Sequence, residues 1–233
     1  MGETIHIQVE GGEMSAYRAR PAAPRAPAVV VLQEIFGVNA VMRDITDGLA
    51  AQGFLAVCPD LFWRIEPGVD ITDRTEAEWK KAFALMSAFD AGQGVKDIAA
   101  TISATRSDAR CSGRVGAVGF CLGGQLAFLT ATQTDADAAV AYYGVGIEGL
   151  VGEAANLTKP VMLHVAEADG FVPPPAQAAI HQGLAGQPLA TLHSYPGRDH
   201  AFARVGGEHY HAADADLAGE RSLAFLRAHL GSA

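Results

Sequence analysis

The hydrophobic positions of this chain form short uninterrupted runs, and segments with helical spacing of apolar residues separate them. Residues 28–32 are a continuous apolar run rich in valine, and residues 54–58 are a second such run. Strands that are buried on both faces of a sheet require runs of this kind. Between them, residues 41–51 show the periodicity of an amphipathic helix that closes at Gly53. The order strand, helix, strand is the repeating unit of a parallel sheet.

The same alternation continues to the end of the chain. Two extended runs at the start, 4–9 and 14–20, flank a Glu-Gly-Gly-Glu segment that predicts a hairpin. No internal repeat or low-complexity linker divides the series, so we predict one domain over residues 1–233. Its fold class is α/β, with a mostly parallel sheet of about eight strands covered by helices on both faces. Further strands are expected at 114–120, 138–143, 161–165 and 189–195, and further helices at 75–89, 94–105, 123–132, 173–184 and 219–230.

Composition and charge exclude several classes of function. The chain has 233 residues, of which 49% are hydrophobic and 18% charged, so it is not intrinsically disordered. Lys plus Arg number 17 and Asp plus Glu 26, a net charge of 17 − 26 = −9, which argues against nucleic-acid and anionic-membrane partners. The apolar runs are far too short to span a bilayer, and the N-terminus lacks the apolar core of a secretory signal. We therefore expect a cytoplasmic protein.

Three cysteines, Cys58, Cys111 and Cys121, are widely spaced and form no C-x-x-C pair. An odd number at such spacing fits neither a disulfide framework nor a zinc ribbon. The histidines and acids of residues 209–216 do not match a metal site either, because residues two apart on a helix do not share a face. We expect no metal.

The strongest local motif is residues 119–124, Gly-Phe-Cys-Leu-Gly-Gly, at the junction of a predicted strand and a predicted helix. A nucleophile elbow has this design, since small flanking residues permit the tight turn that presents the nucleophile to a cleft. Cys121 holds the position where serine is commoner, and a helix N-terminus stabilises a thiolate. The alternative is that Cys121 is a small buried residue and the glycines only permit close packing.

Two further residues fit a triad built on this cysteine. In this architecture an acid follows a later strand and a histidine follows the last strand, so that both lie at the same edge of the sheet. Asp169 and His200 occupy these positions. We predict that His200 deprotonates Cys121 and that Asp169 orients the imidazole and stabilises its charged form. Glu167 competes with Asp169 for the role of the acid.

Four motifs in this order resemble the dienelactone hydrolase family: residues 33–39 (Gln-Glu-Ile-Phe-Gly-Val-Asn), the elbow at 119–124, residues 141–146 (Ala-Tyr-Tyr-Gly-Val-Gly) and residues 199–204 (Asp-His-Ala-Phe-Ala-Arg). The resemblance spans nearly the whole chain. It implies the α/β-hydrolase fold, a Cys-His-Asp triad formed here by Cys121, His200 and Asp169, and no cofactor. The family's type enzyme opens the ring of dienelactone (carboxymethylenebutenolide) during the degradation of chloroaromatic compounds.

The resemblance also implies roles for residues near the nucleophile. Glu34 matches an acid that participates in converting the thiol to a thiolate when the substrate binds. The backbone N–H groups of Ile35 and Leu122 match the oxyanion hole. Arg204 matches an arginine that binds the substrate's carboxylate, although an ion pair with Glu34 is the alternative. The other residues expected to contact the substrate are Phe36, Tyr142 and Trp79.

Two positions depart from the family's pattern. The type enzyme has a second carboxylate-binding arginine and, one turn later, a tyrosine, where this chain has Trp79 and Phe83. Lys80, Lys81 and Arg74 are the candidates that could replace the missing arginine. The departure makes an uncharged or differently shaped ester a plausible substrate.

The chemistry of a thiol nucleophile narrows the substrate class. A thiolate leaves readily, so the tetrahedral intermediate collapses backward unless the departing group is comparably good. Enol esters and enol lactones are therefore favoured over amides. We predict a cysteine hydrolase that opens an enol lactone such as dienelactone through a thioester. The alternatives are a carboxylesterase or lactonase for a different activated ester, and a catalytically silent binding module. We expect a monomer, with a weak homodimer as the alternative.

Overall fold

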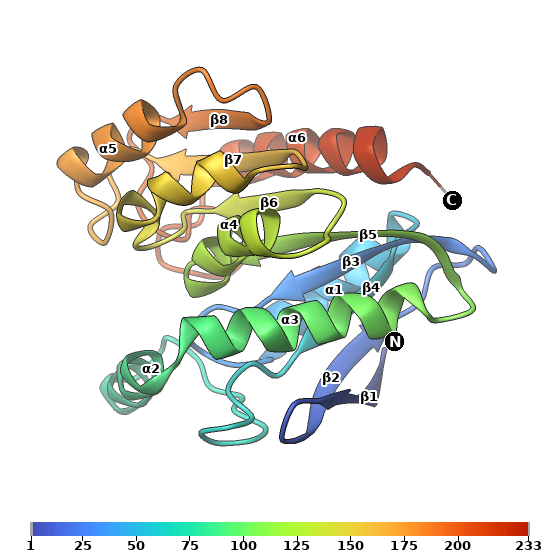
Figure 1. Cartoon of the computed structure of the whole chain (residues 1–233). Helices are drawn as coiled ribbons and strands as arrows, with labels where there is room; N and C mark the ends of the chain where they lie inside the picture. Colours follow the sequence, from blue (N-terminus) through green and yellow to red (C-terminus); the bar gives the residue numbers. More distant parts are fainter. Residues whose placement is uncertain (1, 233) are drawn as a thin grey trace.

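The computed structural model describes residues 2–232 and contains an eight-stranded sheet with the order β1-β2-β4-β3-β5-β6-β7-β8 (Figure 1). The β1–β2 and β2–β4 pairs are antiparallel, and the other pairs are parallel. The mostly parallel sheet predicted from the sequence is thus confirmed. The strands are β1 (Glu3–Val9), β2 (Gly12–Ala19), β3 (Ala26–Leu32), β4 (Leu55–Pro59), β5 (Cys111–Phe120), β6 (Ala139–Tyr142), β7 (Val161–Ala166) and β8 (Ala190–Tyr195).

Helices cover both faces of this sheet. Helices α1 and α6 pack on one face, and α3 and α4 pack on the other (Figure 1). No helix within residues 2–232 is long and apolar enough to cross a membrane. The helices are α1 (Ala40–Ala51), α2 (Glu76–Ala88), α3 (Ala91–Arg106), α4 (Leu122–Gln133), α5 (Pro174–Leu184) and α6 (Ala212–Leu230), with short 3₁₀ helices η1 (Ile147–Gly149) and η2 (Val151–Asn156).

Helix α6 begins earlier than the predicted start at residue 219, so that boundary is wrong. The His211 side chain caps the helix by accepting a hydrogen bond from the Asp214 backbone N–H at 3.3 Å. Residues 212–217 are exposed or half-buried, and Ala218 is the first fully buried residue of the helix. The first turns therefore carry no apolar periodicity from which the helix could be recognised.

The central strands anchor the sheet. Every residue of β3 and of β4 is buried, as the continuous apolar runs predict. Burying one Val or Leu side chain stabilises a fold by roughly 1.5–3 kcal/mol, so this core holds the strand ends firmly in place. Strands β3, β5, β7 and β8 all deliver their carboxyl ends to one edge, and the loops that follow these strands form the site.

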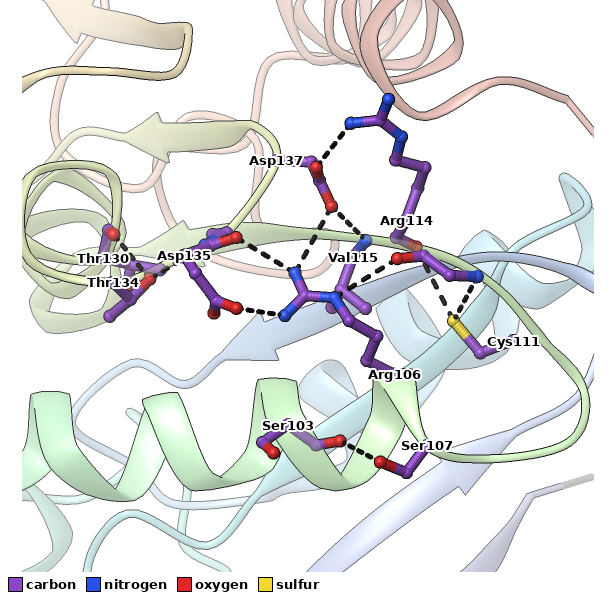
Figure 2. Close-up of polar contacts among 12 residues, drawn as sticks. Ser103, Arg106, Ser107, Cys111, Arg114, Val115, Thr130, Thr134, Asp135 and Asp137 are labelled. Atoms are coloured by element: carbon purple, nitrogen blue, oxygen red, sulfur yellow. Dashed lines mark hydrogen bonds and ion pairs between the residues drawn. The ribbon is translucent and has the colours of Figure 1, made fainter.

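A cluster of charged residues lies at the opposite edge of the sheet, near the amino ends of β5 and β6 (Figure 2). Arg106 at the end of α3 pairs with Asp135 and Asp137, and Arg114 Nη1 lies 2.7 Å from Asp137 Oδ1. The other oxygen of Asp137 accepts the backbone N–H of Val115 at 2.9 Å. Burial opposes ionisation of Asp137, but the Val115 N–H and the two arginines outweigh it and hold the pKa of this carboxyl below its usual range. The cluster therefore joins α3, β5 and the loop before β6.

Candidate active site

Cys121 lies between the end of β5 and the start of α4, with φ 57° and ψ −115°. A positive φ in a residue other than glycine costs on the order of 1–3 kcal/mol and persists only where the surroundings enforce it. This strained turn places the side chain at the N-terminus of α4, where the helix dipole stabilises an anion. Cys121 is 8% exposed and lines a pocket.

The glycines of the elbow are required by close backbone contacts. A Cβ on Gly119 would lie 1.8 Å from the carbonyl oxygen of Gly123, and a Cβ on Gly123 would lie 2.1 Å from the carbonyl oxygen of Leu32. A Cβ on Gly124 would lie 2.5 Å from the carbonyl oxygen of Tyr142. Backbone atoms cannot yield at these distances, so the three glycines let α4 pack directly against the strand ends.

His200 and Asp169 form a buried pair beside Cys121. Nδ1 of His200 lies 2.8 Å from Oδ2 of Asp169, and the two residues are 7% and 3% exposed. The other oxygen of Asp169 accepts the backbone N–H groups of Phe171 at 2.8 Å and Val172 at 3.2 Å, which fixes the carboxylate. Glu167 is exposed. The structure therefore favours Asp169 over Glu167 as the partner of the histidine.

The environment of His200 favours its charged form. Burial lowers the pKa of the imidazole, but the hydrogen bond to Asp169 and the interaction with the Cys121 thiol outweigh burial and raise the pKa to about 10. At neutral pH the ring is then a cation placed next to the thiol. Such a cation stabilises a thiolate, as a sulfur nucleophile requires.

Arg204 is 9% exposed and contacts two carboxylates. Its Nη1 lies 3.3 Å from Oε2 of Glu34, and its Nη2 lies 3.2 Å from Oδ2 of Asp73. The guanidinium carbon also lies 5.3 Å from the centre of the Phe36 ring, a cation–π distance. Burial raises the pKa of Glu34, although the nearby Arg204 and His200 act in the opposite direction. The ion pair of Arg204 with Glu34, left open by the sequence, is present and buried.

These groups surround a pocket of about 120 Å³. Its polar lining comes from Glu34, Cys121, His200 and Arg204, and Ile35 lines it between Glu34 and Phe36. Leu122 directly follows the nucleophile as the first residue of α4. The rest of the wall is apolar and comprises Phe36, Trp79, Phe83, Met86, Val145 and Phe171.

The positions that depart from the family's pattern form an aromatic wall. Trp79 packs edge-on against Phe36 at 5.1 Å and stacks on Phe83 at 5.5 Å between ring centres. Phe83 in turn lies 6.5 Å from Phe171. Among the lining residues in the described part of the chain, Arg204 is the only arginine or lysine. Lys80, Lys81 and Arg74 do not line the pocket, and Lys81 pairs instead with Glu66 at 2.6 Å.

Tyr142 does not lie in this pocket, which corrects the expectation from the resemblance. Its hydroxyl donates to the backbone oxygen of Ala218 at 3.0 Å and lies 2.6 Å from Oγ of Ser222, both in α6. Tyr142 is the last residue of β6 and points to the α6 face, whereas Tyr143 lies past the end of the strand with φ 37° and points toward the site. The Tyr143 ring lies 5.1 Å from that of His200.

Sequence reasoning missed Asp73, Met86, Val145 and Phe171. Asp73 lies in the irregular segment between β4 and α2, where no periodicity or motif marks it. Phe171 could have been inferred from the sequence, because it follows Asp169 in the same loop. In the structure its ring lies 4.8 Å from that of His200. Val145 lies in the motif at residues 141–146, and Met86 follows Phe83 by three residues on α2, so the sequence carried a signal for both.

The other two cysteines lie in the core. Cys58 is fully buried, and burial raises the pKa of its thiol to about 12. Cys111 is 2% exposed and unpaired. Within residues 2–232, no three His, Cys, Asp or Glu residues are grouped so that they could hold a metal ion.

Comparisons with known proteins identify the family of this chain. The profile of the dienelactone hydrolase family matches residues 14–230. The chain is 52% identical to a protein of Azospirillum brasilense, over 95% of this chain and 96% of that protein. It is 42% identical to the carboxymethylenebutenolidase of Pseudomonas putida, over 96% of this chain and 95% of that enzyme.

Solved structures share the fold. A crystal structure of a Klebsiella pneumoniae protein superposes with a TM-score of 0.85 at 31% identity, covering 96% of this chain and 97% of that one. The Pyrococcus furiosus esterase Pf2001 superposes with a TM-score of 0.71 at 13% identity, covering 99% of this chain and 93% of that one, which shows the α/β-hydrolase fold alone. With the profile match and the close relatives, these findings establish that the chain belongs to the dienelactone hydrolase family and is a hydrolase.

Proposed function

We propose that this chain hydrolyses an activated ester or enol lactone by covalent catalysis at Cys121, through a thioester. The observation that carries the proposal is the position of Cys121, which lies at a strained elbow and faces the His200–Asp169 pair inside the pocket. The carboxymethylenebutenolidase of Pseudomonas putida, 42% identical, supports dienelactone as the candidate substrate.

In the first half-reaction, the Cys121 thiolate attacks the carbonyl carbon and the carbonyl oxygen becomes an oxyanion. The backbone N–H groups of Leu122 and Ile35 are the donors proposed for that oxyanion. Collapse of the intermediate breaks the bond to the ring or alkoxy oxygen, which leaves as an enolate or alkoxide and takes a proton from the His200 imidazolium. In a lactone, the leaving oxygen stays on the acyl group, so a single chain remains bound to sulfur.

In the second half-reaction, neutral His200 removes a proton from water, and the resulting hydroxide attacks the thioester carbon. The C–S bond breaks, the carboxylic acid product departs, and the Cys121 thiolate and His200 imidazolium are restored. Asp169 holds the imidazole in one tautomer through both steps. Glu34, which is buried beside Arg204, is proposed to assist formation of the Cys121 thiolate when a substrate binds.

A carboxylesterase for an uncharged substrate is the second candidate. Two observations favour it. Trp79 and Phe83 form an aromatic wall, and Arg204 is already paired with two carboxylates of the protein before any substrate binds. Both candidates use the same thioester chemistry and differ only in what the pocket holds beyond the ester group.

Substitution of Cys121 tests the proposal directly. Cys121→Ala should abolish hydrolysis of dienelactone and p-nitrophenyl acetate, and Cys121→Ser should reduce it heavily, because the site suits sulfur and not a hydroxyl. Mass spectrometry of His200→Ala with an activated ester should detect an acyl adduct on Cys121, since deacylation then lacks its base. Full turnover in Cys121→Ala would refute the thioester route.

Two other outcomes would contradict the proposal as a whole. A Cys121 that does not react with the ester, in a protein without esterase activity, would indicate a binding module. Faster hydrolysis of an anilide than of the esters would exclude the predicted substrate class.

A further inference from the structure

The guanidinium of Arg204 has two carboxylate partners, and only one of them belongs to the pocket wall. Glu34 lines the pocket and its side chain is 4% exposed, whereas Asp73 does not line the pocket and its side chain is 23% exposed. The two acids contact different nitrogens of the guanidinium, Nη1 and Nη2. The Asp73 carboxylate therefore reaches the pocket through its ion pair with Arg204.

Asp73 is held in place by bonds that do not involve Arg204. The indole Nε1 of Trp79 donates to the backbone oxygen of Asp73 at 2.9 Å. On one side of Asp73, Oε1 of Glu78 accepts the backbone N–H and the hydroxyl of Thr72, each at 2.9 Å. On the other side, Thr75 caps α2 and donates its hydroxyl to Glu78 Oε2 at 2.8 Å. The first turn of α2 thus fixes the segment that presents this carboxylate.

The two carboxyl groups that contact Arg204 leave no surplus of positive charge on its guanidinium, and Asp169 balances the His200 cation. One guanidinium faces two carboxyl groups, so even a neutral Glu34 leaves Asp73 to balance the cation. A carboxylate that enters the pocket gains less from a guanidinium that is already neutralised, because its attraction is offset by repulsion from the fixed acid. An uncharged substrate against the aromatic wall is unaffected by this balance.

We propose that Asp73 is a positioning residue that sets the selectivity of the site. By neutralising Arg204, it weakens the binding of esters that bear a carboxylate and favours uncharged esters. This inference rests on the proposed function, since it presupposes that Cys121 hydrolyses esters in this pocket.

The test compares two p-nitrophenyl esters with acyl chains of similar length, the uncharged pentanoate and the monoester of glutaric acid. The wild type should have the higher kcat/KM for the pentanoate. Asp73→Asn keeps the size of the side chain and the backbone oxygen bound by Trp79, and it should raise kcat/KM for the glutarate ester by about tenfold, mainly through KM. The value for the pentanoate should stay within about twofold.

Two control variants separate charge at Arg204 from other effects. Asp73→Glu retains the charge and should keep the wild-type ratio of the two kcat/KM values. Asp70→Asn removes one negative charge from the same segment, but Asp70 pairs with Arg43 at 2.8 Å, so the ratio should not change. Circular dichroism of each variant verifies that the fold is intact.

If Asp73→Asn leaves the ratio of the two kcat/KM values unchanged, the proposed role of Asp73 is overturned. A higher kcat/KM of the wild type for the glutarate ester would also overturn this role, and that measurement does not depend on the folding of any variant. The proposed function fails separately, if neither ester is hydrolysed or if Cys121→Ala still hydrolyses them. If hydrolysis depends on Cys121 but Asp73→Asn keeps the wild-type ratio of the two kcat/KM values, the selectivity role of Asp73 is rejected and the proposed function stands.

Discussion

Nδ1 of His200 lies 2.8 Å from Oδ2 of Asp169, a residue 31 positions earlier in the chain, and both side chains are buried. The bond commits Nδ1 to the carboxylate and leaves Nε2 to face the nucleophile. Because β7 and β8 are parallel neighbours, the loops after them emerge side by side, and this places the two residues within hydrogen-bonding distance.

This pair should make stability depend on pH. The pKa of His200 is raised from 6.5 to about 10, so the interaction stabilises the fold fully below pH 6.5 and is lost as pH rises through about 10. Asp169→Asn removes the main attraction for the proton. The difference in unfolding free energy between wild type and this variant, measured by urea denaturation, should be largest below pH 6.5 and shrink toward pH 10. A difference that grows with pH would contradict this assignment.

The three cysteines should react very differently with iodoacetamide. Cys121 lines the pocket beside the His200 cation, whereas Cys58 is fully buried with a pKa raised to about 12 and Cys111 is 2% exposed. We expect peptide mapping of the folded protein to find the label on Cys121 alone. The matched control is Cys121→Ala, which should remain unlabelled until urea is added. Equal labelling of all three residues in the native protein would contradict the structure.

A methyl group on Gly119 should disrupt the elbow. In Gly119→Ala the new Cβ would lie 1.8 Å from the backbone oxygen of Gly123, so β5 and α4 must separate, at a cost of about 3 kcal/mol. Loss of turnover should accompany the loss of stability. Gly48→Ala is the control, because its Cβ meets nothing within 4 Å on the exposed side of the last turn of α1, and it should stabilise the fold by about 1 kcal/mol. Thermal unfolding distinguishes the two variants.

Arg204→Ala should affect binding and stability together. It removes the only arginine or lysine among the described residues that line the pocket and leaves the buried Glu34 without its partner, which destabilises a fold by about 3–5 kcal/mol. KM should rise most for substrates that bear a carboxylate. Steady-state kinetics on charged and uncharged esters below the unfolding temperature measures this split. An equal rise for both esters would indicate a purely structural role.

Asp137→Asn should weaken the fold without affecting catalysis. Its carboxylate bonds the Val115 N–H and pairs with Arg106 and Arg114 at the edge of the sheet opposite the pocket (Figure 2). We expect a loss of about 1–2 kcal/mol at neutral pH. The pKa of Asp137 is lowered, so this contribution is present above the ordinary value of 3.8 and disappears as pH falls through the lowered pKa. Urea denaturation at neutral and acidic pH, with an esterase assay beside it, measures both effects.

The sequence by itself determined the layer structure and the positions of the proposed catalytic residues. Continuous apolar runs identify strands buried on both faces, and their alternation with helices leaves a parallel sheet as the arrangement that buries them all. In such a sheet the residues after strand ends share one edge, so the spacing of Cys121, Asp169 and His200 along the chain was enough to bring them together. The glycines of the elbow are likewise a local requirement, set by the distance between a strand and the helix that follows it.

Only the tertiary structure decided what surrounds the nucleophile. Tyr142 belongs to a matching motif, yet its place on the strand turns it toward α6 and away from the pocket. Asp73 carries no sequence signal, because its role depends on where an irregular segment meets Arg204 from the far end of the chain. The pattern of hydrophobic residues indicates which strands are buried, and the spacing of the motifs indicates which residues lie at strand ends. Neither records which loops approach each other in space, and in this protein that approach sets the charge and shape of the pocket.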